Sequence, residues 1–429
     1  MRVLVLGATG FIGAAVAVRL RASGHRVAAV ARPRPRRVIP AGQEWIELDI
    51  ARALRTADWV SHLDGIDAVL NCAGVFQDSP RDSTAGVHAG GPAALYEACA
   101  ACGIRRVVHL SALGTAGELL SPFSVTKAEG ERALMALDLD WVILRPSVVL
   151  GRNAYGSGAL FRGLAALPVL PVLPDAGPLQ PVWLDDLTQT MVRLIEADAP
   201  ARITLEIVGP ERLSMQEIVR QYRAWLGWPP ARELRVPDFV LVPAYRLGNV
   251  AGLLGWRPPI RSNARREMAR GAIGDPSAWI AATGLRPVPL GEALAREPAP
   301  VQERWFARLY FLRPLAIAVL SLFWIGTGVA SLGPGWERGV GLLEDTALAA
   351  FAPIVVIAGA LADIAVGFGI AFRRACRKAL QAGIAVTLVY ALAGTLVRPD
   401  LWADPLGAML KTGPILVLML IALAILEER

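Results

Sequence analysis

The stretch Gly7-Ala8-Thr9-Gly10-Phe11-Ile12-Gly13 directly follows the apolar run Arg2–Leu6 and opens a segment with helical periodicity. Glycines in such a strand–turn–helix context allow a tight turn and a close approach to a pyrophosphate, which accepts hydrogen bonds from the helix N-terminus. The spacing is G-x-x-G-x-x-G, which differs from the G-x-G-x-x-G of most dinucleotide-binding folds. The contacts that we predict for a dinucleotide are Gly7, Thr9, Gly10, Phe11, Ile12 and Gly13.

Short apolar runs alternate with helix-period segments throughout residues 1–150. Such alternation predicts βαβ units with right-handed crossovers, so the fold class is α/β with a doubly wound, Rossmann-type parallel sheet. The expected strands are Arg2–Leu6, Arg26–Ala31, Glu44–Leu48, Ala68–Cys72, Val107–Ser111 and Trp141–Arg145.

Charge is distributed unevenly along the chain. The 429 residues include 44 basic and 37 acidic ones, and the mean hydropathy of +0.44 is high for a soluble protein. Residues 314–429 contain 8 basic and 8 acidic residues, which leaves 36 basic and 29 acidic ones in residues 1–313. This distribution excludes a disordered chain, a disulfide-rich module and a simple soluble enzyme.

Four long apolar segments follow residue 313. A membrane-spanning helix needs about 20 predominantly apolar residues, and each segment is close to this length or longer with at most one charge. We therefore expect a bundle of four transmembrane helices. The segments are Pro314–Trp336, Thr346–Phe372, Ala379–Val397 and Leu406–Leu426.

Basic residues flank these segments mainly on one side of the expected membrane. By the positive-inside rule, the side with more Lys and Arg in its short flanks faces the cytoplasm. We therefore expect the α/β domain and both termini in the cytoplasm, at a bacterial-type inner membrane. The inner flanks contain Arg304, Arg308, Arg313, Arg373, Arg374, Arg377 and Lys378, against Arg338, Arg398 and Lys411 on the outer side.

Between the α/β region and the apolar segments, proline and glycine become frequent. We expect a smaller, mostly helical lobe there, and Glu297-Pro298-Ala299-Pro300-Val301 has the composition of a linker. The expected organisation is a dinucleotide-binding domain at 1–150, a substrate lobe with linker at 151–300 and a membrane domain at 301–429.

The cysteines and histidines show no spacing typical of a metal site, so we expect no metal. Cys99 and Cys102 have redox-motif spacing, but they end an Ala-rich segment with the pattern of an ordinary helix. The pI of 9.6 favours membrane lipid headgroups or a cofactor phosphate as partners. Nucleic acid is not expected, because no basic stripe interleaved with aromatic residues is present.

The residue after the second expected strand distinguishes the two nicotinamide dinucleotides. An acid there accepts the ribose 2′-OH of NAD, whereas an arginine accommodates the 2′-phosphate of NADP. This chain has Arg32, followed by Arg34, Arg36 and Arg37, with no acid nearby. We expect Arg32 to contact the phosphate, so that NADP(H) is preferred and NAD(H) is the alternative.

Several short motifs follow the expected strands in the first half of the chain. They are Gly7–Gly13, Asp49-Ile50, Asn71-Cys72-Ala73-Gly74, Ser111, Lys127 and Arg145-Pro146-Ser147. Together they resemble the short-chain dehydrogenase/reductase superfamily, and most closely its extended and atypical members of the NAD-dependent epimerase/dehydratase type. That group includes a membrane-associated accessory subunit of respiratory complex I. Leu179–Asp186 is similar to a second-lobe motif of atypical members, and residues 305–429 resemble the DoxX-like four-helix membrane family.

The resemblance implies roles for these residues. Lys127 would hydrogen-bond the nicotinamide ribose, and Ser111 would orient a substrate carbonyl or hydroxyl. The residues that would line the cofactor are Asp49 and Ile50 at the adenine, Ala73 and Gly74 along its length, and Pro146, Ser147 and Val148 beside the nicotinamide.

The chain departs from the superfamily at its catalytic tyrosine. The family's Tyr-x-x-x-Lys places a phenol and an ammonium on one helical face, where the cation lowers the pKa of the phenol. Here Phe123 stands four residues before Lys127, and it has no proton to donate. Cofactor binding is still expected, whereas acid–base catalysis would need another hydroxyl. The candidates are Ser124, Thr126 and Tyr155.

Asp363 lies in the middle of the second expected span. An ionisable group at bilayer depth is costly and is therefore a candidate functional residue. The alternative is a structural hydrogen bond to another helix, for example to Tyr390 or Thr387.

Three functions fit these features. The first is a membrane-tethered NAD(P)H-dependent oxidoreductase with a lipophilic or quinone-like substrate. The second is a non-catalytic NADP(H)-binding protein with a structural or redox-sensing role, which Phe123 favours. In the third, the membrane domain is the working part and the α/β domain regulates it.

Overall fold

The computed structural model describes residues 1–33, 44–79, 82–115, 117, 121–173, 176–256, 258–405 and 407–426. The chain forms two compact units. The first contains Met1–Asn249 and Pro258–Ala307, and the second contains Val250–Arg257 and Arg308–Arg429. The boundaries between the units fall inside or next to two helices, α8 (Asp238–Leu253) and α12 (Val301–Leu332).

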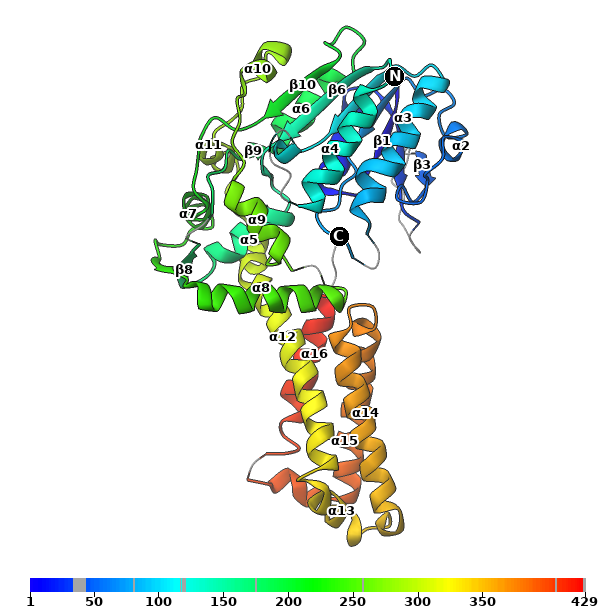
Figure 1. Ribbon diagram of the computed structural model, residues 1–429. Helices are drawn as coiled ribbons and strands as arrows, with labels where there is room; N and C mark the ends of the chain where they lie inside the picture. The colour runs from blue at the N-terminus through cyan, green and yellow to red at the C-terminus, as the bar shows by residue number, and fades with distance from the viewer. Residues whose placement is uncertain are drawn as a thin grey trace. The chain divides into compact units, whose positions relative to one another are not determined.

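A seven-stranded parallel sheet forms the centre of the first unit (Figure 1). Its strands are β1 (Arg2–Leu6), β2 (Arg26–Ala31), β3 (Glu44–Glu47), β4 (Ala68–Asn71), β5 (Arg106–Leu110), β6 (Asp140–Pro146) and β10 (Ile203–Ile207). The order β10-β6-β5-β4-β1-β2-β3 confirms the doubly wound prediction, and β10 is the one strand that the sequence pattern did not reveal. Ligands of such sheets bind at the carboxyl ends of the strands, where the order reverses between β1 and β4.

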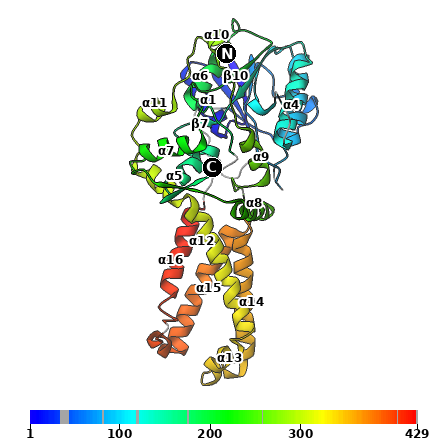
Figure 2. The ribbon, with the colours of Figure 1, turned by 60° about the vertical axis from the view of Figure 1, so that its left-hand side comes forward.

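Helices cover both faces of the sheet, because its strands are apolar on both sides. On one face pack α1 (Phe11–Ala22) and α6 (Leu184–Leu194). On the other pack α3 (Gly91–Ala101) and α4 (Pro122–Met135). Figure 2 shows α1 and α6 on one side of the sheet and α4 on the other. Shorter elements on this part of the chain are α2 (Ala57–Val60), the π-helical turn η1 (Gly86–Gly90) and the 3₁₀ turn η2 (Leu113–Thr115).

The remainder of the first unit is the predicted lobe, which is mostly helical and contains four short strands. α7 (Met215–Trp225) begins at Ser214, whose hydroxyl accepts a hydrogen bond from the Glu217 N–H while the Glu217 carboxylate accepts one from the Ser214 N–H. The other elements are β7 (Val149–Leu150), α5 (Gly156–Ala165), β8 (Val169–Val172), β9 (Val182–Trp183), β11 (Arg232–Arg235), α9 (Ser262–Arg270), α10 (Ser277–Thr283) and α11 (Leu290–Ala295).

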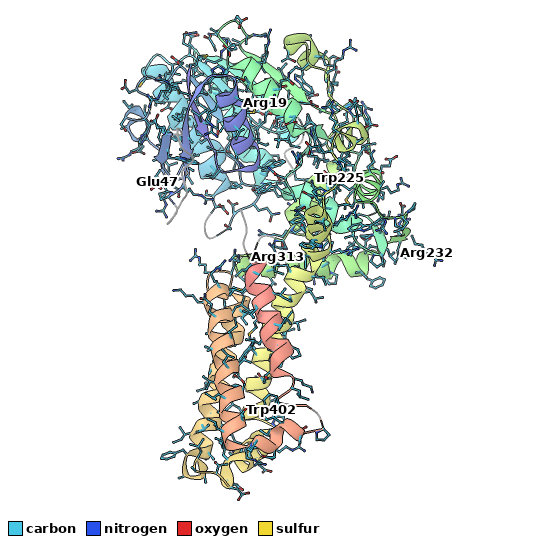
Figure 3. The ribbon with its side chains drawn as sticks, turned by 180° about the vertical axis from the view of Figure 1, so that it is seen from behind. Arg19, Glu47, Trp225, Arg232, Arg313 and Trp402 are labelled. Atoms are coloured by element: carbon cyan, nitrogen blue, oxygen red, sulfur yellow. The ribbon has the colours of Figure 1, made fainter. Side chains whose placement is uncertain are left out.

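The second unit is a bundle of apolar helices. Three helical segments have the length and composition to cross a membrane: α12, Ala349–Ala371 and α15 (Cys376–Val397). Ala349–Ala371 comprises η3 (Ala349–Phe351) and α14 (Ala352–Ala371). Large apolar side chains such as Leu361 are exposed on this unit, as expected for a surface that faces lipid. Arg313 and Trp402 lie toward opposite ends of the bundle (Figure 3).

The fourth expected span, Leu406–Leu426, contains a shorter helix than predicted. Its helix α16 covers Thr412–Ala424, which is 13 residues. Such a helix rises about 20 Å, against a hydrocarbon core of about 30 Å. Gly407 has a φ of +66°, so no helix runs through that position, and residues 408–411 form a turn before α16 begins. Short elements between the long helices are α13 (Trp336–Glu344) and η4 (Pro399–Ala403).

Candidate active site

The predicted dinucleotide-binding turn lies at the carboxyl end of β1. Gly7 has a φ of +70°, which favours glycine, and a Cβ on Gly13 would lie 2.2 Å from the Gly7 carbonyl oxygen. Both glycines are therefore required by the turn itself. Within the described chain, no side chain caps the N-terminus of α1 at Gly10, so its backbone N–H groups are available to an anion.

A buried polar cluster fixes the chain after β4. The Asn71 side-chain amide donates to Tyr96 Oη at 2.8 Å, and its oxygen accepts from the Ala73 N–H at 3.1 Å. Tyr96 Oη also lies 2.8 Å from His109 Nδ1. Burial holds the pKa of His109 well below its usual value, so the ring is neutral. The cluster thus orients the Ala73–Gly74 backbone, where we predict the cofactor to lie.

Lys127 lies on α4 and reaches the ends of two strands. Its Nζ donates to the Leu110 carbonyl oxygen at 2.7 Å and to that of Ala73 at 3.3 Å. Burial lowers the pKa of Lys127 to about 8, against the opposing effects of Cys72 and Glu131. The ammonium therefore lies beside the backbone predicted to line the cofactor.

Phe123 lies one helical turn before Lys127 and packs in an aromatic cluster. Its ring centroid is 5.1 Å from that of Phe76 and 5.4 Å from that of His88, the latter edge to face. His88 Nε2 accepts from the Val75 N–H at 3.0 Å, so Nδ1 carries the proton and donates to Thr126 Oγ1 at 2.9 Å. Burial lowers the pKa of His88 to about 2, so this ring is not a general acid at neutral pH.

The three hydroxyls considered as substitutes for the tyrosine differ in their surroundings. Ser124 Oγ donates to the Ser121 carbonyl oxygen at 3.1 Å within the capping box of α4. Thr126 Oγ1 donates to the Pro122 carbonyl oxygen at 2.8 Å. The Tyr155 ring stacks on Phe11 of the glycine turn at a centroid distance of 5.5 Å. Of the three, Tyr155 is thus the one placed against the predicted cofactor site.

Ser111 directly follows Leu110, the residue whose carbonyl oxygen binds Lys127. Its backbone N–H donates to the Leu144 carbonyl oxygen at 2.7 Å. Its Oγ is buried and has no hydrogen-bond partner among the described residues. A buried hydroxyl without a partner costs free energy. The Ser111 hydroxyl is therefore suited to bond a ligand or a water molecule. Its role in orienting a substrate stays a prediction.

The segment predicted beside the nicotinamide connects the sheet to the lobe. Ser147 Oγ donates to the Ala272 carbonyl oxygen at 2.8 Å, and the Val148 carbonyl oxygen accepts from the Val182 N–H at 3.1 Å. The Ser147 hydroxyl is therefore engaged by protein, while the Val148 side chain is partly exposed.

Arg32 is ion-paired in the structure. Its Nη1 lies 2.9 Å from Oδ1 of Asp82, whose side chain is buried. Sequence reasoning missed Asp82, because the two residues are 50 positions apart and no local pattern links them. A 2′-phosphate at Arg32 would therefore meet a competing carboxylate. Arg34, Arg36 and Arg37 lie outside the described residues.

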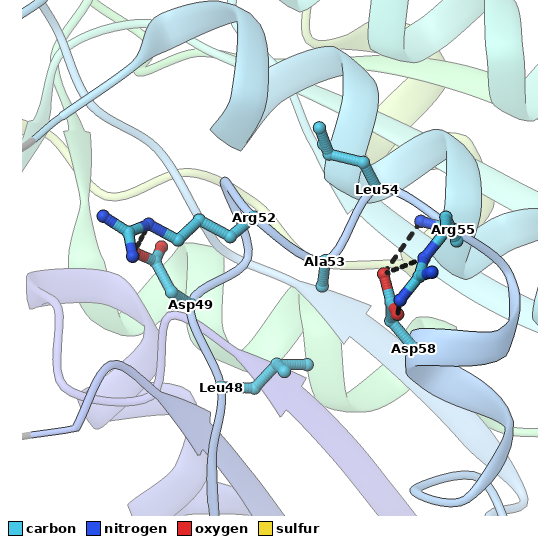
Figure 4. Close-up of a pocket in the computed structure, with 7 residues that line it drawn as sticks. All are labelled: Leu48, Asp49, Arg52, Ala53, Leu54, Arg55 and Asp58. Carbon is cyan, nitrogen blue, oxygen red and sulfur yellow. Dashed lines mark hydrogen bonds and ion pairs between the residues drawn. The ribbon is translucent and has the colours of Figure 1, made fainter.

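Asp49 borders a hollow of about 620 Å³ after β3 (Figure 4). Its Oδ1 accepts from the Ala51 N–H at 3.2 Å, and its Oδ2 lies 3.7 Å from Arg52 Nε. Ile50 is buried next to it. The hollow is on the predicted adenine side and does not include Ser111 or Lys127. Its lining residues are Leu48, Asp49, Arg52, Ala53, Leu54, Arg55 and Asp58.

Two families of known proteins match separate parts of the chain. Residues 3–167 match the NAD dependent epimerase/dehydratase family, and residues 321–420 match the DoxX-like family. The N-terminal domain is epimerase/dehydratase-like, and the C-terminal domain is DoxX-like. Both resemblances predicted from the motifs are thereby confirmed.

Curated relatives of the epimerase/dehydratase-like domain include proteins named as reductases. The chain is 27% identical to the ceramide reductase of Caulobacter vibrioides over 55% of its own length and 74% of that protein. It is 26% identical to the mitochondrial NADH-ubiquinone oxidoreductase 40 kDa subunit of Neurospora crassa over 64% of its length and 72% of that subunit. An uncharacterized protein of Mycobacterium tuberculosis is 29% identical, but the chain covers only 24% of it. These likenesses support an NAD(P)-dependent oxidoreductase.

Solved structures share the fold of the epimerase/dehydratase-like domain. The Bordetella bronchiseptica enzyme WbmG, solved with NAD, superposes with a TM-score of 0.54 at 18% identity, over 69% of this chain and 92% of that one. MoeE5, solved with UDP-glucose and NAD, superposes with a TM-score of 0.53 at 22% identity, over 72% of this chain and 99% of that one. These structures show the fold alone, whereas the match to the NAD dependent epimerase/dehydratase family and the uncapped helix N-terminus support a nicotinamide cofactor.

Asp363 lies on α14 of the DoxX-like domain and is buried. Tyr390 Oη on α15 donates to Asp363 Oδ1 at 2.9 Å, whereas Thr387 Oγ1 donates to Gly383 of its own helix. Of the two predicted partners, Tyr390 is therefore the one that bonds Asp363.

We expect Tyr390→Phe to destabilise the DoxX-like domain by about 0.6 kcal/mol, and at most by about 1.7 kcal/mol, the range for hydrogen bonds between membrane helices. Thermal unfolding in detergent measures this change as a lower melting temperature. Thr387→Val on the same helix is the control, since among the described residues its hydroxyl bonds the Gly383 carbonyl oxygen of its own helix. Equal melting temperatures for the native protein and Tyr390→Phe would contradict a stabilising bond.

Proposed function

We propose that the protein is a membrane-bound oxidoreductase that uses NADPH, and NADH less well, to reduce a lipophilic or quinone-like substrate. The observation that carries the proposal is the Lys127 ammonium, which bonds the carbonyl oxygens of Ala73 after β4 and of Leu110 at the end of β5. Leu110 directly precedes Ser111, whose hydroxyl is unpaired among the described residues. The DoxX-like domain, with three helices able to cross a membrane, supports location at a bilayer.

A bound nicotinamide supplies the hydride in such chemistry. The residues of this chain would bind and align the reactants: the N–H groups at the N-terminus of α1 would donate to the pyrophosphate, Lys127 to the ribose and Ser111 Oγ to the substrate oxygen. Phe123 cannot donate a proton, and His88 beside it stays neutral. Substrates that take their proton from water, such as quinones, therefore suit this site better than simple carbonyls.

A lipid substrate is supported by the relative named ceramide reductase. The alternative function, a non-catalytic NADP(H)-binding protein, is favoured by Phe123 and by the likeness to a subunit of NADH-ubiquinone oxidoreductase. Turnover of NADPH separates the two.

The full-length protein in detergent tests the proposal in two steps. Native mass spectrometry shows which nucleotide and lipid copurify, and we expect NADP(H). Steady-state NADPH oxidation is then measured with quinones, aldehydes and ketones, and we expect the quinones to react fastest. Bound nucleotide without turnover of any acceptor would favour the non-catalytic alternative, and absence of nucleotide binding would refute both.

The affinity for NADPH is expected to fall as the pH rises above about 8, the pKa of Lys127 in the free protein. The protonated amine is the stronger donor to the ribose, so NADPH binding raises the pKa of Lys127. The affinity for NADPH therefore falls as the pH rises from the pKa of Lys127 in the free protein to its pKa in the complex. Below pH 8 the amine is protonated in both states and this dependence vanishes. Lys127→Met should bind more weakly and without the decline. Calorimetric titrations of NADPH from about pH 7 to about pH 9.5 measure this pH dependence. An affinity that rises with pH would contradict the role of Lys127 as a ribose ligand.

For the topology, we expect the first unit to lie in the cytoplasm and the segments 331–345 and 398–408 outside. Single cysteines at Ser331 and at Val18, in a Cys102→Ser background, are exposed to an impermeant reagent in intact cells. Labelling at Ser331 but not at Val18 is the expected result, and the reverse pattern would overturn the orientation. Labelling of both only after lysis would place both on the inner side.

A further inference from the structure

Helix α8 has an apolar stripe on the side that faces away from the protein. At 3.6 residues per turn, its large exposed apolar positions share one arc with Arg246, and the other exposed charge of the helix is Asp238 at its first residue. The large apolar residues of the stripe are Phe239, Val240, Val242, Leu247, Val250 and Leu253, with Phe239, Leu247 and Leu253 exposed by 78%, 69% and 79%.

The other side of α8 is already occupied by protein. A Cβ on Gly248 would lie 1.7 Å from the Ile260 carbonyl oxygen, so the backbones are in close contact there. The Arg265 guanidinium lies 5.9 Å from the centroid of the Tyr245 ring. These contacts fix the rotation of the helix about its axis. A water-facing helix normally exposes polar residues on the side opposite its buried one, so the exposed apolar stripe indicates a partner that covers it.

The end of α8 is bonded to the end of a candidate membrane span within the second unit. The Trp256 indole N–H donates to the Ala371 carbonyl oxygen at 2.7 Å, and the Arg373 N–H donates to that of Leu254 at 3.0 Å. Arg373 also lies 5.4 Å from the centroid of the Trp256 ring. Ala371 is the last residue of α14, and tryptophan and arginine are typical of the level where a span leaves the hydrocarbon.

The sequence around the stripe is basic. Residues 232–270 contain eight arginines and three acidic residues. Such a segment is attracted to anionic lipid headgroups, and an exposed apolar stripe is what inserts between them.

We infer that α8 is an interfacial helix that inserts its stripe into the anionic surface of the bilayer spanned by the DoxX-like domain. This rests on the proposed membrane location and not on catalysis. The helix thus adds a second, peripheral membrane contact to the spans, made by the part of the chain that leads from the lobe.

Spin-label accessibility in lipid nanodiscs tests the inference on the full chain. Labels are placed at Leu247, at Val18 and at Leu361 by single cysteines in a Cys102→Ser background, because Cys102 is the exposed cysteine of the described chain. Nanodiscs contain phosphatidylcholine with or without about 30% phosphatidylglycerol. Apolar oxygen reaches lipid-buried labels, and a water-soluble nickel complex reaches exposed ones.

Val18 and Leu361 are matched controls, since both are exposed apolar residues on helices, at 59% and 54%. We expect Leu247 to resemble Leu361, with greater access for oxygen than for nickel, and the difference to grow with phosphatidylglycerol. Leu247 resembling Val18 while Leu361 stays oxygen-accessible would overturn the inference alone. Leu247 shielded from both reagents would assign the stripe to a second protein surface instead, which also overturns it. Nickel access at Leu361 would overturn the membrane location itself.

Discussion

Phe123→Tyr is expected to raise carbonyl reduction by the full-length protein about 10²–10⁴-fold, the usual contribution of a positioned general acid. The change restores a phenol one helical turn before Lys127, whose cationic form lowers the pKa of a neighbouring phenol. The ring of residue 123 already packs against Phe76 and His88, so the new hydroxyl is added to an ordered side chain. Steady-state NADPH oxidation with aldehydes and ketones measures the gain.

Two comparisons make this result specific. NADPH affinity should change little, since Lys127 and the glycine turn are untouched. Tyr155→Phe, which removes the hydroxyl stacked on the glycine turn, is the matched variant for the alternative donor. Fast carbonyl reduction by the native protein that is lost in Tyr155→Phe and unchanged in Phe123→Tyr would assign the proton to Tyr155.

Arg32→Ala is expected to weaken NADPH binding about 10- to 100-fold and to leave NADH binding nearly unchanged. A charge-assisted bond to the 2′-phosphate is worth about 1.5–3 kcal/mol, which is one to two decades of affinity. Calorimetric titration of both nucleotides measures the change. Asp82→Asn should have the opposite effect and strengthen NADPH binding, because it removes the carboxylate that competes for Arg32.

The control for Arg32→Ala is Arg19→Ala, in the last turn of α1 and therefore at the end of that helix away from the glycine turn. Equal affinities of the native protein for NADPH and NADH would show that Arg32 does not select the phosphate. An equal loss for both nucleotides in Arg32→Ala would instead indicate that the Arg32–Asp82 pair supports the fold of the site.

Local patterns were sufficient for most of the fold. The strand–turn–helix around Gly7–Gly13 and the alternation through residues 1–150 predicted six strands of the parallel sheet, and apolar length predicted four spans, of which three are helical segments able to cross a membrane. The fourth was predicted too long, because hydropathy does not register that Gly407 takes a non-helical φ. The strand β10 was missed because it lies in a region where proline and glycine obscure the alternation.

The candidate site was predicted as a set of residues rather than as an arrangement. Its members follow the strand ends, and the carboxyl ends of parallel strands meet at one edge, so sequence order alone brings Gly7, Ala73 and Ser111 together. Asp82 and His88 were missed as neighbours of Arg32 and Phe123. No spacing rule links them, because each pair lies far apart in the chain and comes together only in the tertiary structure.

By itself the sequence determined the parallel α/β domain, the apolar helices and the loss of the tyrosine at position 123, since each depends on local periodicity or on a residue's own chemistry. Tertiary structure alone decided that Asp82 pairs with Arg32, that Ser111 Oγ stays unpaired and that Tyr390 bonds Asp363. It also decided which side of α8 faces outward. That helix is apolar on much of its circumference, so the contacts of Gly248 with Ile260 and of Tyr245 with Arg265 select the buried side and leave the stripe exposed.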